Sequence, residues 1–144
     1  MHFSAQSRAR GVMSLVVALG IAAACFPGDG GRRELDDSYV LWAVDARSAM
    51  ALWYHTPQLD GLMRVPPTVF AAGWDTRHVI AKRHPNGARA VTEYYIIERA
   101  KDSAARGNGE AVTGPLTAAA FRGARTRLGV APALEFTVVL HDLE

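Results

Sequence analysis

The sequence predicts an α+β fold, an antiparallel β-meander of five to six strands with one C-terminal helix packed on the sheet, after an N-terminal signal peptide. Runs of β-branched and aromatic residues recur between Gly, Pro and Asn turn signals over residues 39–99, which is typical of short strands. One later segment, residues 118–128, carries apolar residues at helical spacing instead. The only cysteine, Cys25, ends an apolar N-terminal segment.

The N-terminal segment has the order of a bacterial export signal. Arg8 and Arg10 precede an apolar run over residues 12–21, and the small residues 22–24 lead directly to Cys25. The run is shorter than the roughly 20 residues that a membrane-spanning helix needs. Residues 1–24 are therefore expected to be a signal peptide.

Three fates of Cys25 are consistent with this pattern. In a lipoprotein, Cys25 is the first mature residue and carries a thioether-linked diacylglycerol, which is the only bound group we expect. In a plain secretory protein, cleavage before Cys25 leaves a free thiol, and in the third interpretation Cys25 is buried in an ordinary core helix. Because the chain has no second cysteine to form an intramolecular disulfide, the lipoprotein interpretation is favoured.

Lipidation predicts a location in the cell envelope, with the membrane as a partner through the lipid anchor. By resemblance to sorted lipoproteins, Phe26 in place of Asp after the cysteine favours the periplasmic face of the outer membrane. The alternative is a secreted or soluble periplasmic protein.

The rest of the chain divides into a tether and one domain. Residues 25–37 are rich in Gly and charge and predict a flexible tether, and residues 38–144 have the length of a single domain. The chain has 16 Lys and Arg against 14 Asp and Glu, so removal of Arg8 and Arg10 leaves a neutral mature protein. This balance predicts no nucleic-acid partner.

Turn residues set the limits of five expected strands. Asp45–Ser48 forms a short loop between the first two strands, Pro66 and Pro67 force an extended entry to the third, and Asn86-Gly87 turns the chain after the fourth. Pro57 and Asp60-Gly61 interrupt the segment between the second and third strands. The expected strands are 39–44, 50–55, 68–74, 77–84 and 91–99.

The C-terminal third predicts a loop, a helix and a last strand. The segment 101–112 is polar and reads as a surface loop. Thr117 is placed to cap a helix over 118–128, and Gly129 is placed to end it. Residues 136–140 are expected to form the final strand.

The fourth expected strand carries the candidate binding residues. His78, Lys82 and His84 share one face of it by their even spacing, but the two histidines are too far apart to share a metal ion. Lys82 and His84 are close enough to face an anionic ligand together, with Arg83 beside them, and Glu93 is a candidate to pair with this face. The alternative is a solvated sheet face that alternates with apolar residues.

The sequence predicts no enzyme, no catalytic residues and no metal site. It has no Gly-x-Ser-x-Gly elbow and no phosphate-binding glycine loop. The aromatic residues of the strands either form a recognition surface or fill the core; they are Trp42, Trp53, Tyr54, Trp74, Tyr94 and Tyr95.

A series of short motifs between about Val65 and Gly129 resembles a family of small bacterial lipoproteins that is catalogued as a domain of unknown function. The motifs are Pro66-Pro67-Thr68-Val69, Gly73-Trp74-Asp75, Ile80-Ala81-Lys82-Arg83-His84-Pro85, Tyr94-Tyr95-Ile96-Ile97 and Gly114-Pro115-Leu116-Thr117, with Phe121 and Leu128-Gly129. The resemblance implies an envelope location and a small, mostly β domain with one helix. It implies no activity, and leaves the Lys82–Pro85 corner either as a binding face or as a structural turn.

These observations together predict a lipid-anchored, non-catalytic binding module for an envelope protein or glycan. The alternative is a periplasmic inhibitor or immunity-type protein that acts against a toxic enzyme. A third possibility, a hydrolase, predicts a deep polar pocket with perturbed titratable groups.

Overall fold

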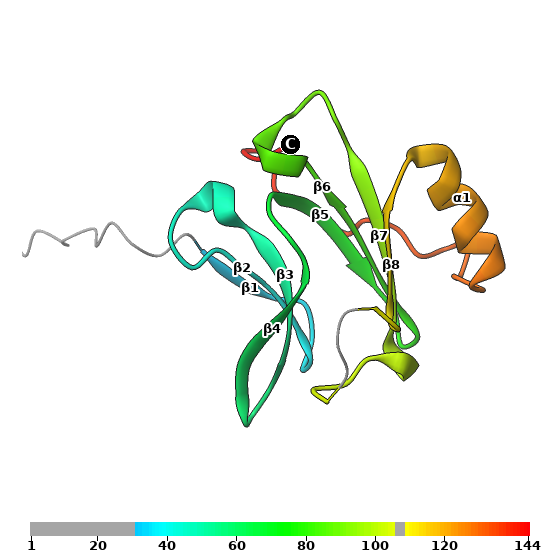
Figure 1. Ribbon diagram of the computed structural model, residues 1–144, viewed down its shortest axis with the longest axis horizontal. Coiled ribbons are helices and arrows are strands. Elements are labelled where there is room, and N and C mark those ends of the chain that lie inside the picture. The colour runs from blue at the N-terminus through cyan, green and yellow to red at the C-terminus, as the bar shows by residue number, and fades with distance from the viewer. Residues whose placement is uncertain (1–30, 106–108) are drawn as a thin grey trace, which may run out of the picture.

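The computed structural model describes residues 31–105 and 109–144, which form two antiparallel sheets and one α-helix in three layers (Figure 1). Sheet A has the strand order β1-β2-β3-β4, namely Arg32–Glu34, Tyr39–Trp42, Ala51–Thr56 and Leu59–Val65. Sheet B has the order β8-β7-β6-β5-β9, namely Val112–Leu116, Glu93–Glu98, His78–Arg83, Val69–Trp74 and Val138–Val139. Helix α1, Ala118–Arg127, covers the face of sheet B that is turned away from sheet A.

Short 3-10 turns connect several strands of the described part, at Arg47–Ala49, Pro85–Gly87 and Arg99–Lys101. No described helix has both the length and the apolar character needed to cross a membrane.

The predicted α+β class, the antiparallel pairing and the helix packed on a sheet are confirmed. Strands β2 and β3 form the expected hairpin, and β5, β6 and β7 pair in the expected order. The Oγ1 of Thr117 accepts a hydrogen bond from the Ala120 N–H at 3.2 Å, which satisfies a free donor of the first helical turn. Gly129 follows the helix with a φ of +67°, as its predicted position requires.

The structure contains more strands than the sequence predicts, and divides them between two sheets. Strand β4 was hidden by Gly61, which has a φ of +154° and lies against the Trp53 ring next to an irregularity in the β3–β4 register. Strand β8 was hidden by Gly114 and Pro115. Proline is tolerated there because β8 lies at the edge of sheet B, where one side of the strand needs no hydrogen-bond donors.

The start of the folded part lies earlier than the predicted boundary at residue 38. Residues 32–34, which the sequence placed in the tether, form β1 and pair with β2, and Leu35 is buried in the core. The predicted signal peptide and Cys25 lie outside the described residues.

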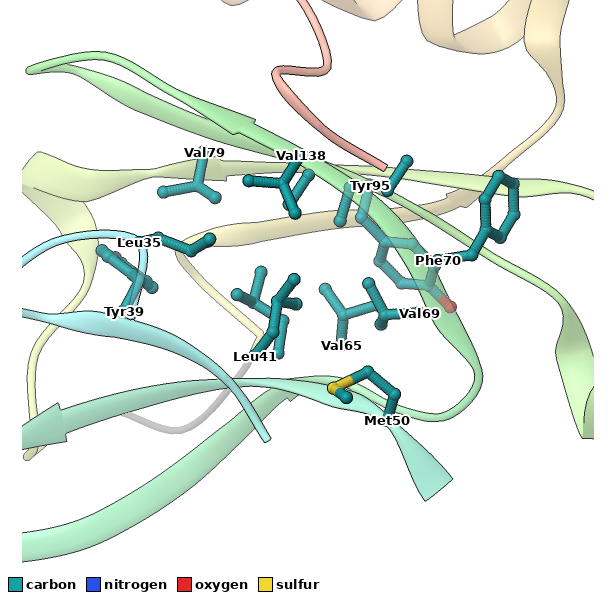
Figure 2. Close-up of a cluster of buried hydrophobic side chains, with 14 of the residues drawn as sticks. Leu35, Tyr39, Leu41, Met50, Val65, Val69, Phe70, Val79, Tyr95 and Val138 are labelled. Atoms are coloured by element: carbon teal, nitrogen blue, oxygen red, sulfur yellow. The ribbon is translucent and has the colours of Figure 1, made fainter. Parts of the chain in front are cut away.

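The main core lies between the two sheets (Figure 2). Leu41 and Val65 of sheet A, and Met50 directly before β3, point toward Val69 and Val79 of sheet B, and all five side chains are at most 1% exposed. A backbone hydrogen bond of 2.7 Å from the Val69 N–H to the Met50 carbonyl joins the layers at one end. Apolar burial between the sheets therefore holds the sandwich together.

Sheet B is buried on both faces. Val79 and Ala81 of β6 pack between the sheets, whereas Ile80 packs with Phe121 in a second cluster beneath α1. The alternative expectation of a solvated sheet face along 78–84 is therefore wrong for the start of β6, because His78 and Ile80 are buried there.

Gly73→Ala is expected to lower the free energy of unfolding by about 3 kcal/mol or more, because the new Cβ has no room. It would lie 1.8 Å from the backbone carbonyl oxygen of Glu135, in the segment that leads into β9. Gly123→Ala is the matched control, since no atom lies within 4 Å of its new Cβ and the helix gains up to about 1 kcal/mol from alanine. Urea unfolding of the two variants measures both effects, and an unchanged stability of Gly73→Ala would contradict the close crossing.

Candidate functional site

The predicted binding residues Lys82, Arg83 and His84 do not form one continuous face. The Nζ of Lys82 lies 4.5 Å from the centre of the Phe136 ring, next to the helix-side cluster. His84 is 4% exposed, and its ring stacks on Phe70 with the ring centres 4.2 Å apart. The three side chains therefore lie in different surroundings.

Arg83 is held by neighbouring groups. Its Nη2 lies 2.7 Å from the Glu93 Oε2 across the β6–β7 pair, and its Nη1 donates to the Pro67 carbonyl at 2.9 Å. Glu93 thus pairs with the corner residue Arg83. A hollow of about 390 Å³ lies beside this corner. The Arg83 guanidinium therefore already has two partners within the protein. No observation tests a binding role of the Lys82–His84 corner, which stays a prediction.

A second hollow lies at the opposite end of β6, and we call it the His78 hollow. It has a volume of about 330 Å³, and it is lined by Thr76, Arg77, His78, Glu98, Arg99, Ala100 and Leu128. The strand ends of β6 and β7, the turn before β6 and the end of α1 all contribute to its wall.

The imidazole of His78 is the unusual group in this wall. The residue is 3% exposed, and its Nδ1 is completely buried without a hydrogen-bond partner among the described residues. The Nδ1 of His84 lies 2.7 Å from the Val91 carbonyl, which only accepts, so this nitrogen carries the proton and donates. The Nε2 of His84 is also buried without a partner among the described residues. A buried polar group without a partner costs about 1–3 kcal/mol. Both imidazoles carry this cost, but only His84 forms a side-chain hydrogen bond within the described part of the chain, so the His78 ring contributes less to the fold.

Asp75 fixes the backbone that carries His78 and Arg77. Its Oδ1 accepts hydrogen bonds of 2.7 Å from the N–H groups of both residues. Burial raises the pKa of the Asp75 carboxyl, but these two hydrogen bonds and the nearby His78 and Arg77 outweigh that effect and hold the pKa below its usual range. The turn therefore holds the backbone of both residues in a fixed conformation.

The charged groups of the His78 hollow differ in how they are paired. Arg99 donates to the Asp36 carboxylate, and Glu98 accepts from Lys101 at 3.0 Å, so both have partners outside the hollow. Arg77 is exposed and makes no ion pair among the described residues. The hollow thus offers one guanidinium that forms no ion pair with the described residues, next to a buried imidazole.

A buried ion pair fixes the segment behind the hollow. The side chains of Arg64 and Asp102 are 2% and 1% exposed, with Nη2 and Oδ1 2.7 Å apart, and the Tyr39 hydroxyl donates to the Asp102 Oδ2 at 2.8 Å. The start of the predicted surface loop 101–112 is therefore clamped onto sheet A. This network depends on contacts between residues 38 or more apart in sequence, so no local pattern indicates it.

The aromatic residues divide between core and surface. Tyr95 is buried between the sheets, whereas Trp42 and Trp53 pack against each other while remaining partly exposed. Their ring centres are 5.9 Å apart, and the Trp53 Nε1–H donates to the Trp42 carbonyl at 3.0 Å. The outer side of sheet A therefore carries partly exposed aromatic surface.

Within residues 31–105 and 109–144, no group of three or more His, Cys, Asp or Glu side chains is arranged to hold a metal ion. The His78 hollow itself was not predicted, since its wall joins three parts of the chain. The only signal in the sequence was His78 at the head of an apolar run, directly after the turn residues 75–77.

The sequence model of one protein family, described as "Protein of unknown function (DUF3997)", matches residues 36–143. No curated protein and no solved structure matches the chain.

His78→Phe is expected to leave the free energy of unfolding unchanged or raise it by up to about 2 kcal/mol, because it removes a buried nitrogen without a partner. His84→Phe, the matched control at the other end of β6, is expected to lower it by about 1 kcal/mol, because the Val91 carbonyl loses its donor. Thermal and urea unfolding compare the two. A larger loss of stability in His78→Phe than in His84→Phe would show that His78 serves the fold.

The stability of the protein is expected to fall as the pH rises above about 10. Burial raises the pKa of the Tyr39 phenol, and the hydrogen bond and charge of Asp102 raise it further. A group with a raised folded-state pKa stabilises fully below its unfolded pKa and loses that contribution as the pH rises toward the folded value. Urea unfolding across this alkaline range should show a steeper decline in the wild type than in Tyr39→Phe, and equal slopes would contradict the burial of Tyr39 beside Asp102.

Proposed function

The chain belongs to this family of proteins of unknown function, and from that premise we propose that it is a lipid-anchored cell-envelope protein. Its domain acts in this proposal as a non-catalytic binding module for another envelope component, a protein or a glycan. The His78 hollow is the observation that carries the binding role.

The N-terminal sequence supports the anchor. Two arginines, an apolar run and small residues precede Cys25, which would carry the diacylglycerol. Strand β1 begins at Arg32, so the connection from Cys25 spans at most about 25 Å when fully extended. The domain would therefore sit next to the membrane surface, and this favours a partner that lies in or close to the same envelope layer.

The position of the His78 hollow supports a binding role in this setting. The short tether joins the domain at sheet A, whereas the end of α1, in the layer beyond sheet B, lines the hollow (Figure 1). A buried imidazole without a partner, in the wall of a hollow, is the kind of group that a protein retains for a ligand.

Crosslinking in intact cells tests the proposal. The wild-type protein should fractionate with membranes and be crosslinked to an envelope component, and His78→Phe should lose that component while it stays folded. Arg122→Gln is the control, because Arg122 is exposed on α1 and lies outside the hollow. Cys25→Ser should move the protein to the soluble fraction.

Two outcomes would count against this proposal. A wild-type protein with a free thiol at Cys25 in the soluble fraction would contradict the anchor, and equal crosslinking by wild type and His78→Phe would contradict the site. Recovery of a toxic enzyme as the crosslinked partner would favour the inhibitor alternative over a structural or glycan partner.

A further inference from the structure

We infer that the His78 hollow binds an oxyanion, a carboxylate or phosphate group carried by an envelope glycan, through the guanidinium of Arg77 and the imidazole of His78. This inference rests on the proposed binding role of the hollow and names the ligand class for it. Its basis is the combination of a cation without an ion pair among residues 31–105 and 109–144, a buried imidazole and fixed backbone geometry.

The donor set of the hollow fits an oxyanion. Arg77 presents a planar fork of N–H donors, which matches carboxylate and phosphate oxygens, and it makes no ion pair among the described residues. His78 is buried beside it with a ring nitrogen that lacks a partner, and the Thr76 hydroxyl lies in the same wall. These three consecutive residues enter the hollow from one turn.

The backbone of that turn is held before any ligand arrives. The Asp75 carboxylate accepts from the N–H groups of Arg77 and His78, and the Arg99 N–H donates to the Arg77 carbonyl at 3.0 Å. Little conformational freedom of the backbone remains to be lost on binding, which favours affinity.

The charges around the hollow also favour an anion. The carboxylate of Glu98 is the one negative group in the described wall, and Lys101 pairs with it. The segment 111–134, which includes α1, contains three arginines and no acidic residue. The Arg77 guanidinium lies 4.0 Å from the position that a Gly129 Cβ would take, at the end of that cationic layer. These cations favour the approach of an anionic group to the hollow, and the Asp75 carboxylate next to Arg77 and His78 opposes it in part.

The purified full-length protein is to be titrated with inorganic phosphate, with D-glucuronate and with the neutral sugar D-glucose, while the ring signals of His78 are followed by NMR. Phosphate, glucuronate or both should shift these signals saturably, and glucose should leave them unchanged. The stronger of the two anions identifies the source as a phosphorylated or a carboxylated glycan.

Variants separate this site from general charge attraction. Arg77→Gln should weaken anion binding at least about tenfold, as expected for the loss of a charged hydrogen-bonding partner, whereas Arg122→Gln should change it less than about twofold. Arg77 is exposed, so its replacement should leave the fold intact even if a His78 variant does not fold. Absence of a saturable shift with both anions, or equal losses in the two arginine variants, would overturn the inference.

The failure of this inference is distinguishable from the failure of the proposed function. If the crosslinked envelope component depends on His78 but neither anion binds or competes, the binding role stands and the oxyanion assignment is wrong. If an anion binds at the hollow but no envelope component is crosslinked, the assignment stands and the proposed function is wrong.

Discussion

The burial of sheet B on both faces is the constraint on which the rest of the structure depends. Its central strand β6 sends Val79 toward sheet A and Ile80 toward α1, so that neither face tolerates a solvated side chain at these central positions. Polar residues are therefore confined to the two ends of β6, where hollows open at His78 and beside Arg83. Both candidate sites of this protein follow from that arrangement.

The polar side chains at the two ends of β6 differ in how many hydrogen-bond partners they have. At the far end, Arg83 pairs with Glu93 and the His84 imidazole donates to the Val91 carbonyl, so that this corner joins β6 to its neighbours. At the near end, the Asp75 turn supports the backbone of His78, yet the ring itself lacks a partner among the described residues. Each imidazole leaves one buried nitrogen without a partner among the described residues, but only His84 forms a side-chain hydrogen bond there, and this difference favours a binding role for the His78 end.

The sequence predicts those elements whose signals are local. Thr117 and Gly129 define both ends of α1, and the β-branched runs around β5, β6 and β7 define three strands, because capping and turn chemistry act over a few residues. Strands β4 and β8 escape prediction because their glycines and Pro115 are tolerated only through tertiary contacts and an edge position. The Arg64–Asp102 pair and the His78 hollow join distant segments, and no local pattern reports them.

The most direct test of the central claim is a crystal structure of the protein isolated from membranes, with attention to the ring nitrogens of His78. We predict that the imidazole lies in the wall of an open hollow, and that its hydrogen-bond partner is a bound anion or ordered water and not a protein group. A collapsed hollow in which a protein atom satisfies the ring would contradict the account, because His78 would then be an ordinary core residue.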